Sequence, residues 1–397
     1  MRILLFVVLF LVSFDMHAQT PLLAPYMLVL GASGAMIGVV LGAYAISNLG
    51  GNLIAGPFLD RFPKKWFVAG GLLLAGLILS GQGVVQAPEH FFVLRLILGF
   101  LMAFVSPACF AMLGETGRTR AEQGELMAKN GMVLTTAAIV SPAVGSFFAV
   151  QFGYGQSFVI LGGIMAAAGV FALLVLPGSR ADGGSVSDSA ASTANSAAVA
   201  ARLPQQSSLM AVVANPYLYP AFLGGFAVVY AQGTLIYEVP LLIQRHDLSP
   251  SVTGILFSLK GLGALATLSQ FWLARTSPEQ RTLVGLCLMS LLTYGLAIGL
   301  DVSLYLMMFL FGICSGLLFP ALSTILMLHV PRDLYGSAFS LFSAVTSAGA
   351  ILSPIVAGII DNWNHSFFIV FFVTGGAFLL GGLHRLIQQG AASPIDR

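Results

Sequence analysis

The chain has 397 residues and a formal net charge of +2; 57% of its residues are hydrophobic and 8% are charged. Soluble proteins carry roughly a quarter charged residues, and a soluble fold cannot hide this much apolar surface. The composition therefore excludes a soluble protein and indicates a polytopic membrane protein whose main solvent is the lipid bilayer. The small net charge says nothing about partners, because it comes from many dispersed loops, and we expect no nucleic acid to bind.

Apolar runs long enough to cross a membrane recur along the whole chain. A bilayer core about 30 Å thick needs about 20 helical residues per crossing. Helices are expected because unpaired backbone groups are costly in hydrocarbon and no barrel-like alternation is present. We predict an all-α membrane protein with twelve transmembrane helices, near residues 3–28, 33–57, 66–86, 90–113, 126–149, 156–177, 214–242, 251–273, 282–300, 303–330, 338–360 and 365–387.

The first predicted helix shares some features with a secretory signal. Arg2 precedes an apolar run, and His17-Ala18-Gln19 resembles a cleavage site. Apolar character resumes at Pro21, however, and the segment has a counterpart in the second half of the chain. We therefore expect a retained first helix.

Basic residues gather in alternate loops and at both termini, and the opposite loops offer only Arg245. Cytoplasmic loops carry the excess of Lys and Arg in membrane proteins. This asymmetry predicts that both termini are cytoplasmic, and the compact size and short loops suggest a bacterial cell membrane. The residues on the basic side are Arg2, Arg61, Lys64, Lys65, Arg118, Arg120, Lys129, Arg180, Arg202, Arg275, Arg281, Arg332, Arg385 and Arg397.

Residues 178–209 are rich in Ser, Ala, Gly and Asn and show no apolar period. We expect a disordered cytoplasmic linker there, which separates a six-helix bundle at 1–177 from a second at 210–397. The halves are related: a shift of about 213 residues places Pro107-Ala108 on Pro320-Ala321, and a shift of 212 places Ser141-Pro142 on Ser353-Pro354. The coincidences indicate a duplicated six-helix unit with pseudo-two-fold symmetry.

The segment between the second and third predicted helices reads Gly-Pro-Phe-Leu-Asp-Arg-Phe-Pro-Lys-Lys, from residue 56 to residue 65. Its pattern resembles the cytoplasmic signature between helices 2 and 3 of the major facilitator superfamily. The resemblance implies a conformational latch made of Gly56, Asp60, Arg61 and Lys65; a generic basic turn is the alternative. Leu273 replaces the acid in the second half, so such a latch is one-sided.

The fourth predicted helix contains Arg95-Leu-Ile-Leu-Gly99, which resembles the helix-4 signature of the same superfamily. In related drug–proton antiporters this Arg is assigned to proton coupling. An Arg in a membrane span is costly and should face protein or water. Snorkelling to the outer interface is the alternative for Arg95.

The first predicted helix carries three polar residues in its apolar run. Asp15 and Gln19 share one helical face, whereas His17 points elsewhere. A carboxyl in a membrane is rare unless it binds a cation or a proton, so we expect Asp15 to couple to protons and Gln19 to bind substrate. A permanent pair with Arg95 or Lys260 is the alternative. His17 is a further substrate-binding candidate, or it hydrogen-bonds a neighbouring helix.

The seventh predicted helix places Tyr230, Thr234 and Glu238 at intervals of four residues, a spacing that makes a polar stripe on one face. These residues are predicted to bind substrate, with exposure at the outer interface as the alternative for Glu238. Lys260 lies too deep in the eighth predicted helix for easy snorkelling. It is predicted either to pair with a buried acid or to anchor an anionic group of the substrate.

The fifth predicted helix contains Ser141-Pro142-Ala143-Val144-Gly145-Ser146. This is similar to a degenerate form of the Gly-Pro-x-x-Gly-Gly stretch that exporters of the superfamily often carry. Small residues allow helices to pack closely, so Pro142, Gly145 and the equivalent Pro354 are predicted helix-packing residues.

The chain has no phosphate-binding GxxxxGK[ST] loop, no catalytic constellation and no metal-ligand spacing. We therefore expect no enzyme activity, no cofactor and no metal site. The resemblance implies a monomeric transporter that works by alternating access, most like the drug–proton antiporter branch. The hypothesis is proton-coupled efflux of a small organic molecule, such as a drug, a metabolite or a metallophore-like chelator. A proton-coupled nutrient importer and a non-transporting membrane receptor are the alternatives.

Overall fold

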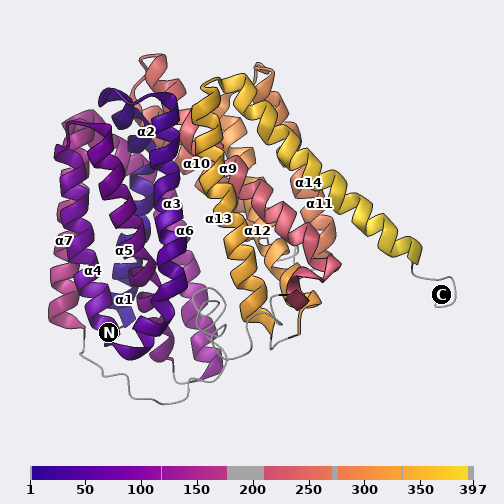
Figure 1. Ribbon diagram of the computed structural model, residues 1–397, viewed down its shortest axis with the longest axis horizontal. Coiled ribbons are helices and arrows are strands. Elements are labelled where there is room, and N and C mark those ends of the chain that lie inside the picture. The colour runs from indigo at the N-terminus through magenta and orange to yellow at the C-terminus, as the bar shows by residue number, and fades with distance from the viewer. Residues whose placement is uncertain (1, 118, 177–209, 271–275, 332–333, 392–397) are drawn as a thin grey trace.

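The computed structural model describes residues 2–117, 119–176, 210–270, 276–331 and 334–391, and no strand occurs within these ranges. The helices form two bundles that lie side by side (Figure 1). The predicted linker at 178–209 lies outside the described residues. The exact domain limits therefore stay a prediction.

The first bundle holds the helices before residue 177 and has one continuous apolar core, with Leu5, Phe91 and Phe158 fully buried in it. Its helices are α1 (Arg2–Ala18), α2 (Thr20–Val29), α3 (Gly34–Arg61), α4 (Lys64–Val84), α5 (Pro88–Glu115), α6 (Arg120–Phe152) and α7 (Tyr154–Val175). The α6 helix has 33 residues and begins before the predicted span at 126–149, because the Thr119 hydroxyl caps it at the backbone N–H of Glu122.

The helices α1 and α2 form one span that is bent by 41°. The bend follows from Pro21, which has no N–H to donate to the carbonyl of His17 and whose ring crowds that carbonyl. Residue Gln19 therefore lies at the joint between the two helices. The polar residues of the first predicted helix are thus gathered beside a break in the backbone.

The second bundle packs around its own apolar core, in which Phe311 and Phe367 are fully buried. Its helices are α9 (Tyr219–Arg245), α10 (Pro250–Leu268), α11 (Pro278–Ala297), α12 (Leu304–His329), α13 (Tyr335–Ile360) and α14 (Trp363–Ala391). Ser249 and Ser277 cap α10 and α11, and each cap is followed by a proline that suits the first helical turn.

Ten of the described helices are long and apolar enough to cross a membrane, and the bent pair of α1 and α2 makes an eleventh span. The α11 helix is less apolar, but it is 20 residues long and packs between α12 and α14 as the remaining helix of the second bundle. The predicted layout of twelve helices in two bundles is confirmed, and the chain is a multi-pass membrane protein.

The α2 helix contacts α9 and α10, but the two bundles touch mostly through the pairs α3 with α13 and α6 with α10. At both contacts a glycine lets one backbone approach the other helix. A Cβ on Gly38 would lie 2.1 Å from the backbone oxygen of Pro354, and one on Gly254 would lie 1.9 Å from Oγ of Ser146. Such backbone contact through small residues is the usual way in which helices associate in lipid.

The contacts between the bundles lie towards one end of the molecule. We call the end that carries Arg2, Arg61 and Lys64 the basic end, and the other end the opposite end. At the opposite end the Tyr154 hydroxyl donates to Oε1 of Gln244 over 2.8 Å and so joins α7 to α9. In Figure 1 the bundles lie together at the opposite end and diverge towards the basic end, where the chain begins.

Candidate functional site

A cavity of about 440 Å³ lies where the bundles begin to diverge, lined by α1, α3, α5 and α6 of the first bundle and by α10 of the second. Its volume is within the range of small-molecule sites. Much of the lining is apolar, from residues such as Leu98, Met102 and Leu134. The polar side chains that line it are those of Ser13, Asp15, His17, Gln19, Tyr44, Arg95, Ser106 and Thr135.

Asp15 and Arg95 are joined by the side chain of Gln19. Nε2 of Gln19 donates to Oδ2 of Asp15 over 2.7 Å, and Nη1 of Arg95 donates to Oε1 of Gln19 over 2.5 Å. Asp15 is 5% exposed and Arg95 8%, so the network is buried in the cavity wall. Among the described residues, Oδ1 of Asp15 and Nε of Arg95 have no hydrogen-bond partner. Each charged group therefore keeps one polar atom free for another partner.

Arg95 is held from its other side by Tyr44 of α3. Its Cζ atom lies 4.8 Å from the centroid of the Tyr44 ring, which is a cation–π distance. Gly99, one turn further along α5, makes this possible, because a Cβ there would lie 2.3 Å from Oγ of Ser47. The Gly99 carbonyl also accepts from Asn48 over 3.1 Å. The Arg–Gly spacing thus brings α5 against α3 and sets Tyr44 beside the guanidinium.

Tyr44 was not among the residues that the sequence predicted. A tyrosine in an apolar helix carries no signal of its own, and its role depends on a contact between helices that the sequence does not specify. The same applies to Ser106 and Thr135, which are single hydroxyl residues in long apolar runs.

His17 faces the cavity with one ring nitrogen already engaged. Its Nδ1 lies 2.8 Å from the backbone oxygen of Ser13, one turn earlier. A carbonyl oxygen only accepts, so Nδ1 carries the proton in this contact and Nε2 remains for another partner. His17 belongs to the same cavity as Asp15 and Gln19, although it lies on another part of the helix.

Lys260 stands beside the cavity on the second bundle. Gly261 and Ala264, its neighbours on α10, line the cavity, and the ammonium lies close enough to His17 for the two groups to interact electrostatically. Its Nζ is 6.0 Å from the centroid of the Phe257 ring. In the described part of the chain the ammonium makes no hydrogen bond and no ion pair. Lys260 is therefore an unpaired cation next to the cavity.

The predicted stripe on α9 does not line this cavity. Thr234 is 1% exposed, and its hydroxyl bonds to the backbone oxygen of Tyr230 over 3.2 Å. Tyr230 packs on Phe226, with ring centroids 5.7 Å apart. Glu238 is 3% exposed and lies beside Ser366 of α14, not at an exposed interface. The stripe therefore faces the interior of the second bundle.

The residues of the predicted latch lie at the basic end, where α3 ends at Arg61 and α4 begins at Lys64. Gly56 is in the last turns of α3, Arg61 is exposed and Lys65 is half-buried. The side chain of Asp60 and the second-half position Leu273 lie outside the described residues. Lys64 forms an ion pair with Glu115 at 2.5 Å, which ties the turn to the end of α5.

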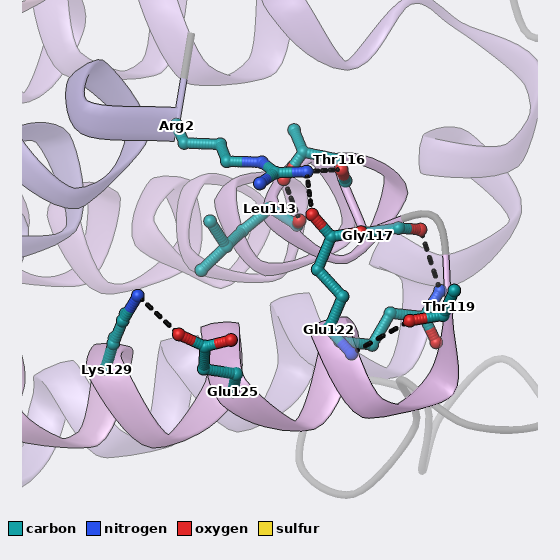
Figure 2. Close-up of polar contacts among 9 residues, drawn as sticks. Arg2, Leu113, Thr116, Gly117, Thr119, Glu122, Glu125 and Lys129 are labelled. Atoms are coloured by element: carbon teal, nitrogen blue, oxygen red, sulfur yellow. Dashed lines mark hydrogen bonds and ion pairs between the residues drawn. The ribbon is translucent and has the colours of Figure 1, made fainter.

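A polar cluster at the basic end fastens the start of α1 to the connection between α5 and α6. Nη2 of Arg2 donates to the backbone oxygen of Thr116 over 2.5 Å and forms an ion pair with Glu122, also at 2.5 Å (Figure 2). On α6, Lys129 pairs with Glu125 at 2.7 Å. Exposed pairs of this kind contribute about 0–1 kcal/mol each, so the cluster serves mainly to position the helix ends.

The predicted packing residues lie at helix contacts. A Cβ on Gly145 would be 2.1 Å from the backbone oxygen of Ala18, so α6 presses on the joint between α1 and α2. The carbonyl of Pro142 faces Gly254 of α10, and that of Pro354 faces Gly38 of α3. All three residues therefore lie at close contacts between neighbouring helices.

Comparison with known proteins agrees with this architecture. The Multidrug resistance protein MdtG of Klebsiella pneumoniae (strain 342) is 23% identical over 364 residues, which covers 87% of this chain and 84% of that protein. Multidrug resistance protein 2 of Bacillus subtilis (strain 168) is 29% identical over 156 residues, and this match spans only 38% of the length of that relative.

Two solved structures show the same fold. A bacterial homologue of the human lysosomal transporter Spinster, in an inward-facing and unoccupied conformation, superposes with a TM-score of 0.78 at 14% identity, covering 99% of this chain and 98% of that one. A mutant of the nucleoside transporter NupG superposes with a TM-score of 0.75 at 17% identity, covering 96% of this chain and 99% of that one.

The family model of the Major Facilitator Superfamily matches residues 5–303 and 284–392, and so covers nearly the whole chain. Members of this family are transporters and not enzymes. With its two bundles, its interfacial cavity and this match, the chain belongs to the major facilitator superfamily.

Proposed function

We propose that the protein exports a small organic molecule in exchange for protons. The observation that carries the proposal is the buried network of Asp15, Gln19 and Arg95 in the wall of the cavity. Ionisable groups inside a membrane are costly and mark ion pathways or proton relays. Two of the relatives are named multidrug resistance proteins, which supports efflux as the direction.

The orientation follows from the basic residues. The positive-inside rule assigns the basic end to the cytoplasm, in the cell membrane of a bacterium, with both termini on that side. The conformation is then inward-facing, because the bundles meet towards the outer end. A monomer suffices for this mechanism, since both bundles that line the cavity belong to one chain.

Asp15 is the group that exchanges protons in this proposal. Its Oδ1 has no hydrogen-bond partner in the described structure and is the free site for a proton. Protonation removes the negative charge that Gln19 connects to Arg95, so the guanidinium loses its counter-charge when the proton binds. The cavity thus changes its net charge by one between the two states, and this change couples proton movement to the rocking of the bundles.

Alternating access would proceed by rocking of the bundles about their contacts. The contacts of Gly38 with Pro354 and of Gly254 with Ser146 close the outer side in the observed conformation. Opening the outer side requires these helices to separate and the ends near the cytoplasm to approach. The latch at Gly56, Asp60, Arg61 and Lys65 is at the correct end to hold such an outward-facing state.

Everted membrane vesicles test direction and coupling together. Vesicles with an acidic lumen are given naphthalene-1-sulfonate, naphthalene-1-sulfonamide or naphthalen-1-ylmethylammonium, and the compound inside is measured by fluorescence. We expect accumulation of at least one compound that exceeds the accumulation in vesicles without the protein, needs the pH gradient and vanishes with a protonophore. Gradient-driven loss of compound from the lumen would indicate an importer. Transport at the same rate with and without the pH gradient would overturn proton coupling.

A further inference from the structure

The cavity holds more positive than negative charge. Asp15 is the only carboxylate among the described residues that line it, and Arg95 lines it as well. Lys260 adds a second cation at its edge. The other acid that was predicted within a membrane span, Glu238, faces α14 inside the second bundle and does not offset these cations.

Lys260 carries the positive charge that no described carboxylate of the cavity offsets. Asp15 and Arg95 offset each other through Gln19, and Arg95 has Tyr44 as a further partner. Lys260 has neither a carboxylate nor a hydrogen-bond acceptor within the described ranges. An ammonium at this depth in a membrane normally pairs or reaches water in a cavity, so the natural partner of Lys260 is a group that enters the cavity.

His17 lies on the other bundle, near Lys260, and faces the same cavity. Its Nδ1 donates to the Ser13 carbonyl, so Nε2 of the neutral ring is an acceptor, and Lys260 alone offers positive charge to a ligand on this side. Leu9, Val12 and Leu134 offer an apolar wall. The cavity of about 440 Å³ therefore combines a mainly apolar lining with the Lys260 ammonium at its edge.

We infer that the substrate is an organic anion: a compact apolar body with one negatively charged group, which Lys260 binds at the edge of the cavity. The inference rests on the proposed function in that the cavity is the transport site. A permanent organic cation would place a third positive charge beside Arg95 and Lys260. Repulsion between like charges is strong in a low dielectric, so binding of a cation would be costly.

Equilibrium binding to the whole protein in lipid nanodiscs tests the charge preference without any transport step. The probes are naphthalene-1-sulfonate, naphthalene-1-sulfonamide and naphthalen-1-ylmethylammonium, which share one body and differ in charge. We expect the sulfonate to bind about tenfold or more tightly than the ammonium compound. Lys260→Gln is expected to weaken sulfonate binding by about tenfold, the usual effect of losing one good charged contact, and to leave sulfonamide binding nearly unchanged.

Two further variants separate a direct contact from a structural effect. Lys129→Gln removes an exposed lysine that pairs with Glu125 away from the cavity, and it should bind all three probes like the parent. Lys260→Arg keeps the charge and should restore sulfonate binding. The inference is overturned if the ammonium compound binds as well as the sulfonate, if the sulfonate does not bind, or if Lys260→Gln keeps the parent affinity.

These outcomes are separate from those for the proposed function. If the protein exports a cationic or neutral probe in a proton-driven way and shows no preference for the sulfonate, the organic-anion substrate is rejected. The proposed exchange for protons then still stands. Tight binding of the sulfonate with no response of transport to the pH gradient would reject the antiporter and keep the anion site.

Discussion

Asp15 and Arg95 do not form a direct ion pair in the described structure; the carboxamide of Gln19 lies between them and bonds to both, at 2.7 Å and 2.5 Å. The distance between the charges is therefore set by a neutral side chain. Such a linkage lets the carboxyl change its charge while the guanidinium keeps its position, because Gln19 and Tyr44 hold Arg95 in both states.

Replacing Asp15 by Asn tests the role of its charge directly. Asn has nearly the same shape but cannot exchange a proton, so we expect proton-driven accumulation in everted vesicles to be lost while probe binding in nanodiscs persists. Asp301→Asn makes the same chemical change in an exposed loop and should transport like the parent. Unchanged gradient-driven transport in Asp15→Asn would remove Asp15 from the coupling mechanism.

Replacing Gln19 by Leu tests the linkage. The substitution leaves the buried carboxylate and guanidinium without their shared partner, and hydrogen bonds to charged groups contribute roughly 1.5–3 kcal/mol each. We expect a lower midpoint of thermal unfolding in detergent.

Thr20→Val is the matched control for Gln19→Leu, because it changes the next residue at the same joint, whose hydroxyl makes only a 3.5 Å contact with the Met16 carbonyl. In the Asp15→Asn background the cost of Gln19→Leu should shrink, since the carboxylate is already absent. An equal cost in both backgrounds would show that the two residues do not act together.

The contact of α3 with α13 predicts how the outer side opens. A methyl group at position 38 would meet the carbonyl of Pro354 at 2.1 Å, so Gly38→Ala must push the two helices apart. We expect the population to shift towards the outward-facing state, seen as a longer distance between spin labels at the outer ends of α3 and α13. Gly50→Ala is the control on the same helix, because no described atom lies within 4 Å of its added methyl. Equal distances in both variants would show that this contact does not hold the outer side closed.

A charged pair at the outer end predicts an effect of salt. Arg245 pairs with Asp361, which caps α13 in a left-handed conformation at φ 45° and lies against Gly34 of the first bundle. Asp361→Asn removes the charge but tolerates the same backbone conformation. The Asp361 carboxylate also lies at the N-terminus of α3, whose partial positive charge attracts it across the two bundles, so we expect a small shift towards the outward-facing state in the same spin-label assay. High salt should produce a similar shift in the parent and little further change in the variant.

The sequence predicted the fold well because its signals are local. Twelve apolar runs specify twelve helices whatever their neighbours, and the Arg95–Gly99 spacing is a feature of one helix. Asp15 and Gln19 are one turn apart, so their shared face could be predicted from the helix alone. Their meeting with Arg95 required a resemblance to known proteins, since it depends on a contact between α1 and α5.

The α9 stripe is a feature whose packing partner could not be predicted from the sequence. Regular spacing establishes that Tyr230, Thr234 and Glu238 share a face, but it does not say which neighbour that face meets. The structure turns them towards the interior of the second bundle, and the cavity is lined instead from α10. Tyr44 was missed for the same physical reason: its position against Arg95 depends on how Gly99 packs on Ser47.

Because of the break at Gln19, the two parts of the first transmembrane span pack against different helices. The α1 part packs on α5 and α6, whereas α2 also touches α9 and α10 of the other bundle. When the bundles rock, the two parts are pulled by different halves of the molecule, and the joint between them must flex. Asp15, whose charge we expect to change, lies one helical turn before this joint. Binding of a single proton therefore acts at the place where a small rotation of α2 is transmitted to both bundles.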